Sequence, residues 1–194
     1  MPPNVAGEWL RAILTGAGYP LTLLSTLLMR LRADHDVNGL RAAVLKAVLI
    51  RNFQMEVPVS LDVENGDSGY LLGRLFAAYE YAQTQALGAS VNATIRDQCY
   101  GTASATPRAV FPLLQRKATH HLSRLRKDKP GLAVNLDRRI GEIFELTDPD
   151  ALLVPTLSAQ RQALFAIGYY HQRNDFYRRK DEARGDAPAA PQEQ

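Results

Sequence analysis

Apolar residues recur at steps of three and four along most of this 194-residue chain. Such spacing places them on one side of an α-helix, which turns about 100° per residue. The pattern is clearest between Thr106 and Lys129, at Val110, Phe111, Leu114, Ala118, Leu122 and Leu125. Thr106 is a favourable N-cap and Pro107 a favourable first helical residue, so this stretch predicts a helix. Because Pro112 has no amide hydrogen, we expect it to loosen the first turns, with the regular helix beginning near Leu113.

Seven further segments show helical spacing or helix-capping residues. They are residues 5–15, 20–33, 36–53, 70–87, 92–101, 131–146 and 158–180. We expect Ser68, Asn92 and Ser158 to cap three of them, and Thr102–Ala105 to form a small-residue hinge before the central helix. No strong strand pattern is present along the chain. The sequence therefore predicts an all-α fold, a helical bundle of about eight helices joined by short loops.

The helical pattern is interrupted between residues 56 and 69. Valines and a leucine alternate with other residues there, and Glu64-Asn65-Gly66-Asp67 has the composition of a turn. We interpret 56–69 as an extended linker that follows an N-terminal three-helix segment, 1–55. A C-terminal bundle over 70–182 comes next. The final residues, 183–194, are polar and rich in Pro and Ala, which predicts a disordered tail.

Composition sets the broad class of the protein. Hydrophobic residues make up 46% of the chain and charged residues 22%, which is typical of globular proteins. No apolar run approaches the roughly 20 residues of a membrane span, and the N-terminus has no signal-peptide pattern. The single cysteine, Cys99, cannot form an internal disulfide. These features predict a protein of the reducing cytoplasm that does not enter a membrane.

Charge is distributed unevenly along the chain, although the net charge is only +3. Residues 106–140 carry nine Lys and Arg against two Asp, and residues 161–180 carry five against one. Residues 56–72 and 141–160 are each net −4. Clustered basic charge favours a polyanionic partner. The acidic segments suit either docking of partners or pairing with the basic segments.

Two predicted helices carry the strongest binding signals. The central one places cations opposite its apolar face, at Arg116, Lys117, His120, Arg124 and Lys127, with Ser123 beside them. A solvated charged face is the alternative, but such faces usually contain interspersed Asp and Glu, which this one lacks. The last helix interleaves aromatic rings with cations, at Tyr169, Tyr170, Arg173, Phe176, Tyr177, Arg178, Arg179 and Lys180. Those rings could stack on bases or fill a core, and the terminal cations could simply complement the helix dipole.

Signals for catalysis are weak. Cys99 lacks a neighbouring base, and the adjacent His120 and His121 lack the i, i+4 spacing of a zinc pair. His171 and Asp175, one turn apart, suit an acid–base pair or a helix-stabilising contact. No glycine-rich phosphate loop occurs. We therefore expect a protein that is not an enzyme and uses no cofactor or metal.

Several stretches resemble the C-terminal third of the large subunit of the type I-C CRISPR Cascade complex. They are VNGLRAAVLKAVLIRNF (37–53), EVPVSLD (56–62), GYLLGRLFAAYEYAQ (69–83), NATIRDQCYGTASATPRAVFPLL (92–114) and ALFAIGYYHQRNDFY (163–177). In that family the same region is also made as a separate small subunit from an internal start. The small subunit is a helical bundle whose copies contact the backbone subunits, the crRNA–target duplex and the displaced DNA strand.

The resemblance implies a non-catalytic role in antiviral defence, in which backbone contacts stabilise the R-loop while base pairing reads the sequence. The implied partners are crRNA, target DNA, the Cascade backbone and large subunits and further copies of the chain. Nucleic-acid contacts then fall to Arg116, Lys117, Arg124, Lys127, Arg138, Arg139, Arg173, Arg178 and Arg179. The alternative is a purely architectural adaptor that binds other subunits without touching nucleic acid.

Two departures limit the resemblance. The chain lacks the N-terminal two-thirds of the large subunit, so PAM reading does not carry over. It is also longer at its N-terminus than a small subunit needs. Met55 precedes EVPVSLD, and a start there would leave 140 residues, the size of a small subunit. The alternative is that Met55 is only a packing residue and Met1 is the start.

Overall fold

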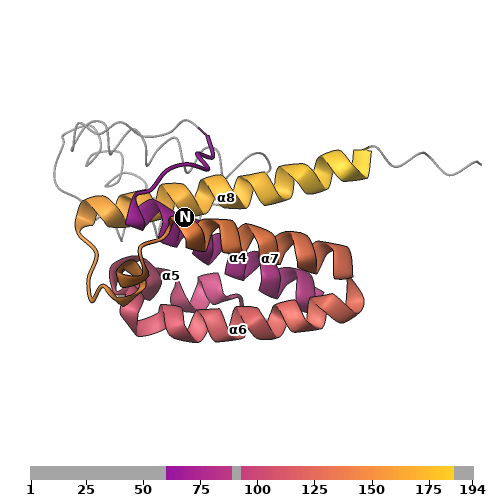
Figure 1. Ribbon diagram of the computed structural model, residues 1–194, viewed down its shortest axis with the longest axis horizontal. Coiled ribbons are helices and arrows are strands. Elements are labelled where there is room, and N and C mark those ends of the chain that lie inside the picture. The colour runs from indigo at the N-terminus through magenta and orange to yellow at the C-terminus, as the bar shows by residue number, and fades with distance from the viewer. Residues whose placement is uncertain (1–59, 89–92, 186–194) are drawn as a thin grey trace, which may run out of the picture.

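The computed structural model describes residues 60–88 and 93–185, with side chains up to residue 178. It contains α4 (Ser68–Leu87), α5 (Ile95–Ala105), α6 (Pro107–Asp128), α7 (Pro130–Leu146), the 3-10 helix η2 (Pro149–Leu153) and α8 (Ala159–Gly185) (Figure 1). The all-α prediction is confirmed over these ranges, which hold five α-helices and no strand. The three helices predicted within residues 1–55 lie outside the described residues, so the total of about eight stays a prediction.

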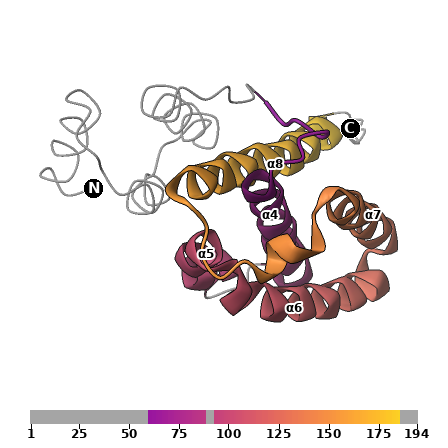
Figure 2. The ribbon, with the colours of Figure 1, turned by 60° about the vertical axis from the view of Figure 1, so that its left-hand side comes forward.

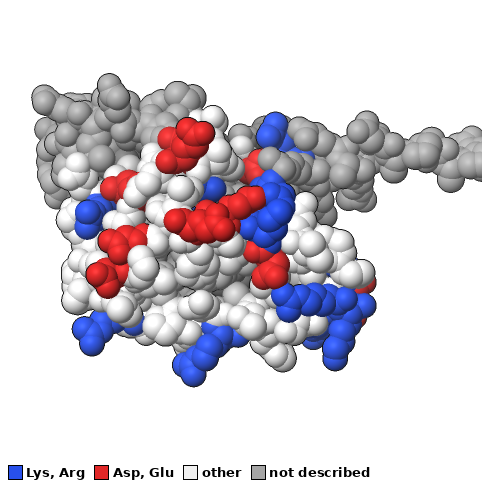
Figure 3. Space-filling model, in the orientation of Figure 1, with Lys and Arg blue, Asp and Glu red and all other residues white. Residues whose placement is uncertain are grey.

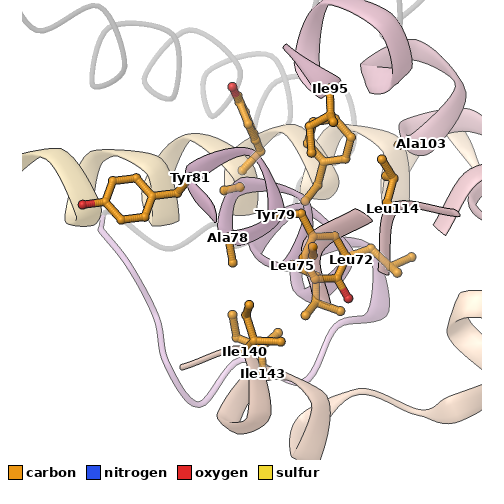
Figure 4. Packing of buried hydrophobic residues seen from close by; sticks show 14 of the residues in the cluster. Leu72, Leu75, Ala78, Tyr79, Tyr81, Ile95, Ala103, Leu114, Ile140 and Ile143 are labelled. Atoms are coloured by element: carbon orange, nitrogen blue, oxygen red, sulfur yellow. The ribbon is translucent and has the colours of Figure 1, made fainter. Parts of the chain in front are cut away.

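Helix α4 lies at the centre of the bundle. Figure 2 shows it surrounded by α8, α5, α6 and α7. Small or apolar residues occupy all sides of this helix, a pattern typical of a helix that is buried on every face. Its side chains meet residues of three other helices, among them Ile95 and Ala103 of α5, Leu114 of α6 and Ile140 and Ile143 of α7 (Figure 4).

Glycines allow α4 and α8 to cross with their backbones in contact. A Cβ added at Gly73 would lie 2.0 Å from the carbonyl oxygen of Phe165, and one added at Gly168 would lie 2.1 Å from that of Tyr70. Any larger residue at these positions would push the helices apart. The glycines therefore set the distance between α4 and α8.

Residues 60–69 of the predicted linker are described. Residues 60–67 have no regular structure and pack against this helix pair, whereas Ser68 and Gly69 belong to α4, so the linker ends earlier than predicted. The guanidinium of Arg74 donates to the carbonyl oxygens of Asp62 (3.3 Å) and Val63 (3.2 Å). The Asp62 amide donates to the hydroxyl of Tyr70 at 3.0 Å, and that hydroxyl lies 3.1 Å from Nδ1 of His171. The segment is thus fastened to α4, and through the Tyr70 hydroxyl it is linked to α8.

Three predicted helix boundaries were wrong. Helix α4 is capped by Asp67, whose Oδ1 accepts from the amides of Gly69 and Tyr70, so Ser68 is already helical. Helix α5 is capped by Thr94 in a reciprocal capping box with Asp97, whereas Asn92 lies outside the described residues. It also continues through the predicted hinge, because burial of Ala103 and Ser104 against the core favours the helical conformation.

Helix α6 is continuous from Pro107 and includes Pro112, so the prediction of a regular helix from Leu113 was wrong. Proline removes one backbone hydrogen bond, but Val110 and Phe111 beside it are buried and hold this turn in place. The helix start is also tied down, since the Arg108 amide donates to the carbonyl oxygen of Val154. Packing thus outweighs the local cost of the proline.

At the other end of the bundle, Ser158 precedes α8 as predicted, and its hydroxyl accepts from the Arg161 amide at 3.3 Å. Helix α8 continues to Gly185, so residues 183–185 are helical rather than part of the predicted tail. The rest of that tail, 186–194, lies outside the described residues. Within the described ranges, no helix is both long enough and apolar enough to cross a membrane.

Candidate nucleic-acid interface

Helix α6 separates its residues into two faces. Eight residues of the helix are buried against the core, among them Leu114, His121 and Leu125. The opposite face carries a basic row, which consists of Arg116, Lys117, His120, Arg124 and Lys127. All of its members are exposed except Lys117, which is half-buried. The arrangement predicted from helical spacing is therefore the one that the structure contains.

Few carboxylates neutralise the basic row. Arg116, Lys117 and Lys127 have no acidic partner among the described residues. Arg124 lies 3.9 Å from Asp128 one turn later, and because both side chains are more than half exposed, water screens this pair strongly. Figure 3 shows Lys and Arg along the lower edge of the molecule, where α6 runs in Figure 1, with Asp and Glu gathered above them. The row is thus an uncompensated positive surface.

The dimensions of the row suit a polyanion. From Arg116 to Lys127 the helix rises about 16 Å, at about 1.5 Å per residue. Phosphates along one strand of B-DNA rise about 3.4 Å each, so the row spans about four or five of them. A straight helix with cations on one face can therefore follow a nucleic-acid backbone without contacting its bases.

Arg138 and Arg139, adjacent on α7, have different surroundings. Arg138 is exposed and forms an ion pair with Glu142. Arg139 is only 14% exposed, donates to Asp175 of α8 at 2.7 Å and lies over the ring of Phe176. Arg139 therefore joins α7 to α8 inside the bundle and has little surface left for a ligand.

Arg173 belongs to a buried network around Glu80. The Glu80 carboxylate is 4% exposed, accepts from the Tyr169 hydroxyl at 2.7 Å and lies 3.4 Å from Nε of Arg173. Arg96 of α5 approaches the same carboxylate at 3.9 Å. Complete burial, followed by the charge of Glu80, raises the pKa of Tyr169 well above its usual value, so the phenol stays protonated and donates. The network holds α4, α5 and α8 together.

The aromatic rings of α8 fill the core. Tyr169, Tyr170 and Phe176 are buried, and Phe176 stacks on Tyr81 of α4 with ring centroids 4.5 Å apart. Tyr177 is half-buried beneath the guanidinium of Arg173. Of the two roles considered from the sequence, these rings therefore fill the core, and they do not form a stacking surface for bases.

The end of α8 lies on the other side of α4 from the basic row (Figure 2). Arg178 is exposed and lies 3.6 Å from Asp175, whereas the side chain of Arg179 lies outside the described residues. Figure 2 shows α4 between α6 and α8. The predicted site residues thus fall into two groups, the basic row on α6 and a set on α7 and α8 that is partly used to hold the core.

The titratable residues weighed for catalysis lie on α5, α6 and α8. His171 is buried beside the Tyr70 hydroxyl, while the Asp175 carboxylate pairs with Arg139. Cys99 is half-buried on α5. His121 is buried, and its pKa is lowered by burial and then by the nearby cations of His120, Lys117 and Arg124. In the part of the chain that the structure describes, no three His, Cys, Asp or Glu side chains group as metal ligands.

A comparison with models of known protein families identifies the family of this chain. The family described as "CRISPR-associated protein (Cas_Csd1)" matches residues 1–177, which is most of the sequence and includes the whole basic row. No curated protein matches the chain. From this match, the chain belongs to the Cas_Csd1 family of CRISPR-associated proteins.

Proposed function

We propose that this chain is a non-catalytic subunit of a type I-C CRISPR interference (Cascade) complex. In this proposal it corresponds to the C-terminal region of the large subunit or to the small subunit made from it. It contacts the crRNA–target duplex and the displaced DNA strand in the cytoplasm and so stabilises the R-loop. Membership of the Cas_Csd1 family and the motifs in the sequence support the assignment. The observation that carries the binding role is the basic row on α6 with its lack of carboxylates.

The proposed mechanism is electrostatic. Cations that neutralise phosphates release condensed counterions, so binding is strong at low salt and weakens steeply as salt rises. Base pairing between crRNA and target supplies the sequence information, and the subunit needs only to hold the backbone. Arg116, Lys117, Arg124 and Lys127 supply the charge. Arg139 and Arg173 instead hold the bundle together, and they position the row without touching the ligand.

The test is a gel shift of the reconstituted complex on target DNA at several salt concentrations. Changing Arg116, Lys117, Arg124 and Lys127 together to Glu should weaken binding and lower the salt slope by about three to four. Unchanged target binding at every salt concentration would remove the row from the mechanism.

Helix α6 offers a matched control for this test. The pair Arg116→Glu with Lys127→Glu changes the net charge by the same amount as Arg108→Glu with Arg126→Glu, on another flank of the same helix. Arg108 and Arg126 are exposed, and the Arg126–Asp137 pair is a surface contact. Only the first pair should weaken binding strongly. Equal effects of the two pairs would mean that net charge, rather than the basic row, determines affinity.

A second candidate function is an architectural adaptor without nucleic-acid contact. The corner between α7 and η2 exposes Leu146 and Leu153 beside the carboxylates of Glu145, Asp148 and Asp150. Exposed apolar side chains with acidic neighbours suit a basic protein partner. Filter binding of the isolated chain to single-stranded DNA at low and moderate salt separates the two functions, because an adaptor would retain no DNA at either concentration.

The proposal that the chain is not an enzyme has its own test. A Cys99→Ala, His171→Ala double variant should support normal interference if neither group takes part in chemistry. Because His171 is buried, the folding of the double variant is checked by circular dichroism. His171→Gln serves as a milder variant at the same position. Loss of interference by a correctly folded variant would contradict the proposal.

A further inference from the structure

His120 lies at the centre of the basic row. Arg116 and Arg124 are one helical turn before and after it, and Lys117 is three residues before it, so all three lie on its side of the helix. The His120 side chain is exposed, and no hydrogen bond or ion pair holds it within the described residues. Its nearest aromatic neighbour is His121, with ring centroids 5.9 Å apart. The imidazole is thus free to meet a ligand that occupies the row.

The carboxylates of α6 and of the helices beside it are engaged in ion pairs within the described residues, except that of Glu145 at the end of α7. On α6 and α7, Asp128 faces Arg124, Asp137 pairs with Arg126, and Glu142 pairs with Arg138. On α4 and α5, Glu80 lies in the buried network and Asp97 pairs with Arg96. The Arg126–Asp137 pair also shows that α7 packs on a flank of α6 about 120° around the helix from His120.

The remaining ionisable groups lie farther along α6 or are buried. Glu145, Asp148 and Asp150 belong to the end of α7 and to η2, and η2 packs near Arg108, about 18 Å along the helix from His120. Tyr79 of α4 packs on Phe111 near the same end, and burial raises its pKa, so it stays neutral. Cations therefore dominate the surroundings of His120.

His121 does not compete for a proton at this site. It is buried, and burial together with the charges of His120, Lys117 and Arg124 lowers its pKa. Its Nδ1 is enclosed without a hydrogen-bond partner in the described structure, so a ligand on the surface cannot reach that atom. A proton taken up when an anion arrives at the row therefore goes to His120.

We infer that His120 is a proton-coupled phosphate contact of the α6 interface. Imidazole is the side chain that changes charge between about pH 5 and pH 8. A phosphate beside the ring favours its protonated form, which then donates to a phosphate oxygen. Nucleic-acid binding thus takes up a proton, and affinity falls as pH rises. The inference rests on the proposed function, because it requires a phosphodiester on the basic row.

The test uses the full chain and a mixed-sequence DNA duplex with a rhodamine label, followed by fluorescence anisotropy at constant ionic strength. Between about pH 6 and about pH 8 the wild-type chain should lose affinity about fivefold, the size expected for partial uptake of one proton. The His120→Gln variant should bind at every pH as the wild type does at the upper end. The His120→Arg variant, with a permanent charge, should bind tightly throughout. Circular dichroism confirms that each variant keeps its helix content.

The possible outcomes separate this inference from the proposed function. A pH-independent affinity in the wild type, or the same pH dependence in His120→Gln, overturns the role of His120 and leaves the basic row in place. The second result would assign the proton to another group, such as His171. An absence of binding by the wild type at any pH would instead contradict the proposed function.

Discussion

Arg74 of α4 and Arg173 of α8 have environments opposite to that of Arg116 on α6. Arg74 and Arg173 lie in the interior, where Arg74 donates to Gln172 and to linker carbonyl oxygens and Arg173 faces Glu80. Arg116 on α6 is exposed and has no carboxylate partner in the described part of the chain. A buried guanidinium requires partners, whereas an exposed one needs only water. In this fold, the arginines that remain available for a ligand are therefore those without partners.

The largest loss of stability is expected from a substitution where the backbones of α4 and α8 come closest. Gly73→Ala would place a methyl group against the Phe165 carbonyl oxygen, so the helices must separate, and we expect a loss of about 4 kcal/mol in the free energy of unfolding. Chemical denaturation measures it.

Gly101→Ala is the matched control, because nothing lies within 4 Å of the added methyl in α5. It should leave stability unchanged or raise it by up to about 1 kcal/mol. Equal stabilities of the two variants would mean that the helices do not cross at the glycines.

The next effect concerns the buried network. Glu80→Gln keeps the shape of the side chain but removes the carboxylate that Arg173 and Arg96 approach, although Arg96 keeps its pair with Asp97. The loss should cost about 2–3 kcal/mol because both guanidiniums retain some contact with water. Thermal or urea unfolding measures this loss. DNA affinity of the folded variant should equal that of the wild type, and a selective loss of affinity would contradict the structural role of Arg173.

A smaller effect compares two neighbours on α7. Arg139→Ala removes the 2.7 Å ion-pair partner of the buried Asp175 carboxylate, which keeps Arg178 at 3.6 Å, and it removes the cover of Phe176, for an expected loss of about 2 kcal/mol. Arg138→Ala removes only an exposed pair and should cost less than about 0.5 kcal/mol. Unfolding midpoints of the two variants provide the measurement. Similar losses would show that the two environments do not differ as the structure indicates.

The smallest effect on stability belongs to the basic row. Arg116→Ala should change the free energy of unfolding by less than about 0.5 kcal/mol, because the side chain contacts little else. The same change should reduce the salt slope of DNA binding by about 0.9. A loss of stability without a change in the salt slope would mean that Arg116, like Arg173 of α8, stabilises the fold and does not bind DNA.

Much of the described fold could be predicted because local signals agreed with the packing. Spacing and caps correctly placed the central helix, its buried and exposed faces and the start of α8. Caps failed where two candidates stood close together, as with Asp67 and Ser68, since only the folded backbone decides which side chain reaches the free amides. Whether the helix continues through Pro112 also depended on the burial of its neighbours, which the sequence alone does not reveal.

The candidate site was harder to predict, because sequence alone does not pair residues from distant helices. Arg138 and Arg139 are adjacent and identical in type, and only the position of Asp175 on α8 separates their roles. Glu80 lies between two tyrosines in an apolar run, and nothing in that run indicated that it would pair with Arg96 and Arg173. By contrast, the basic row depends on a single helix, so helical periodicity was sufficient to predict it.

The pairing of α4 with α8 has a consequence for synthesis on the ribosome. Tyr70 and His171 are 101 positions apart in the sequence, and Glu80 and Tyr169 are 89 apart. At about 5–20 residues per second, α4 emerges about 5–20 seconds before the helix that covers most of it. During that interval α5, α6 and α7 can pair with their neighbours, but the apolar surface of α4 stays exposed. The nascent chain is therefore most prone to aggregation immediately before its last helix is made.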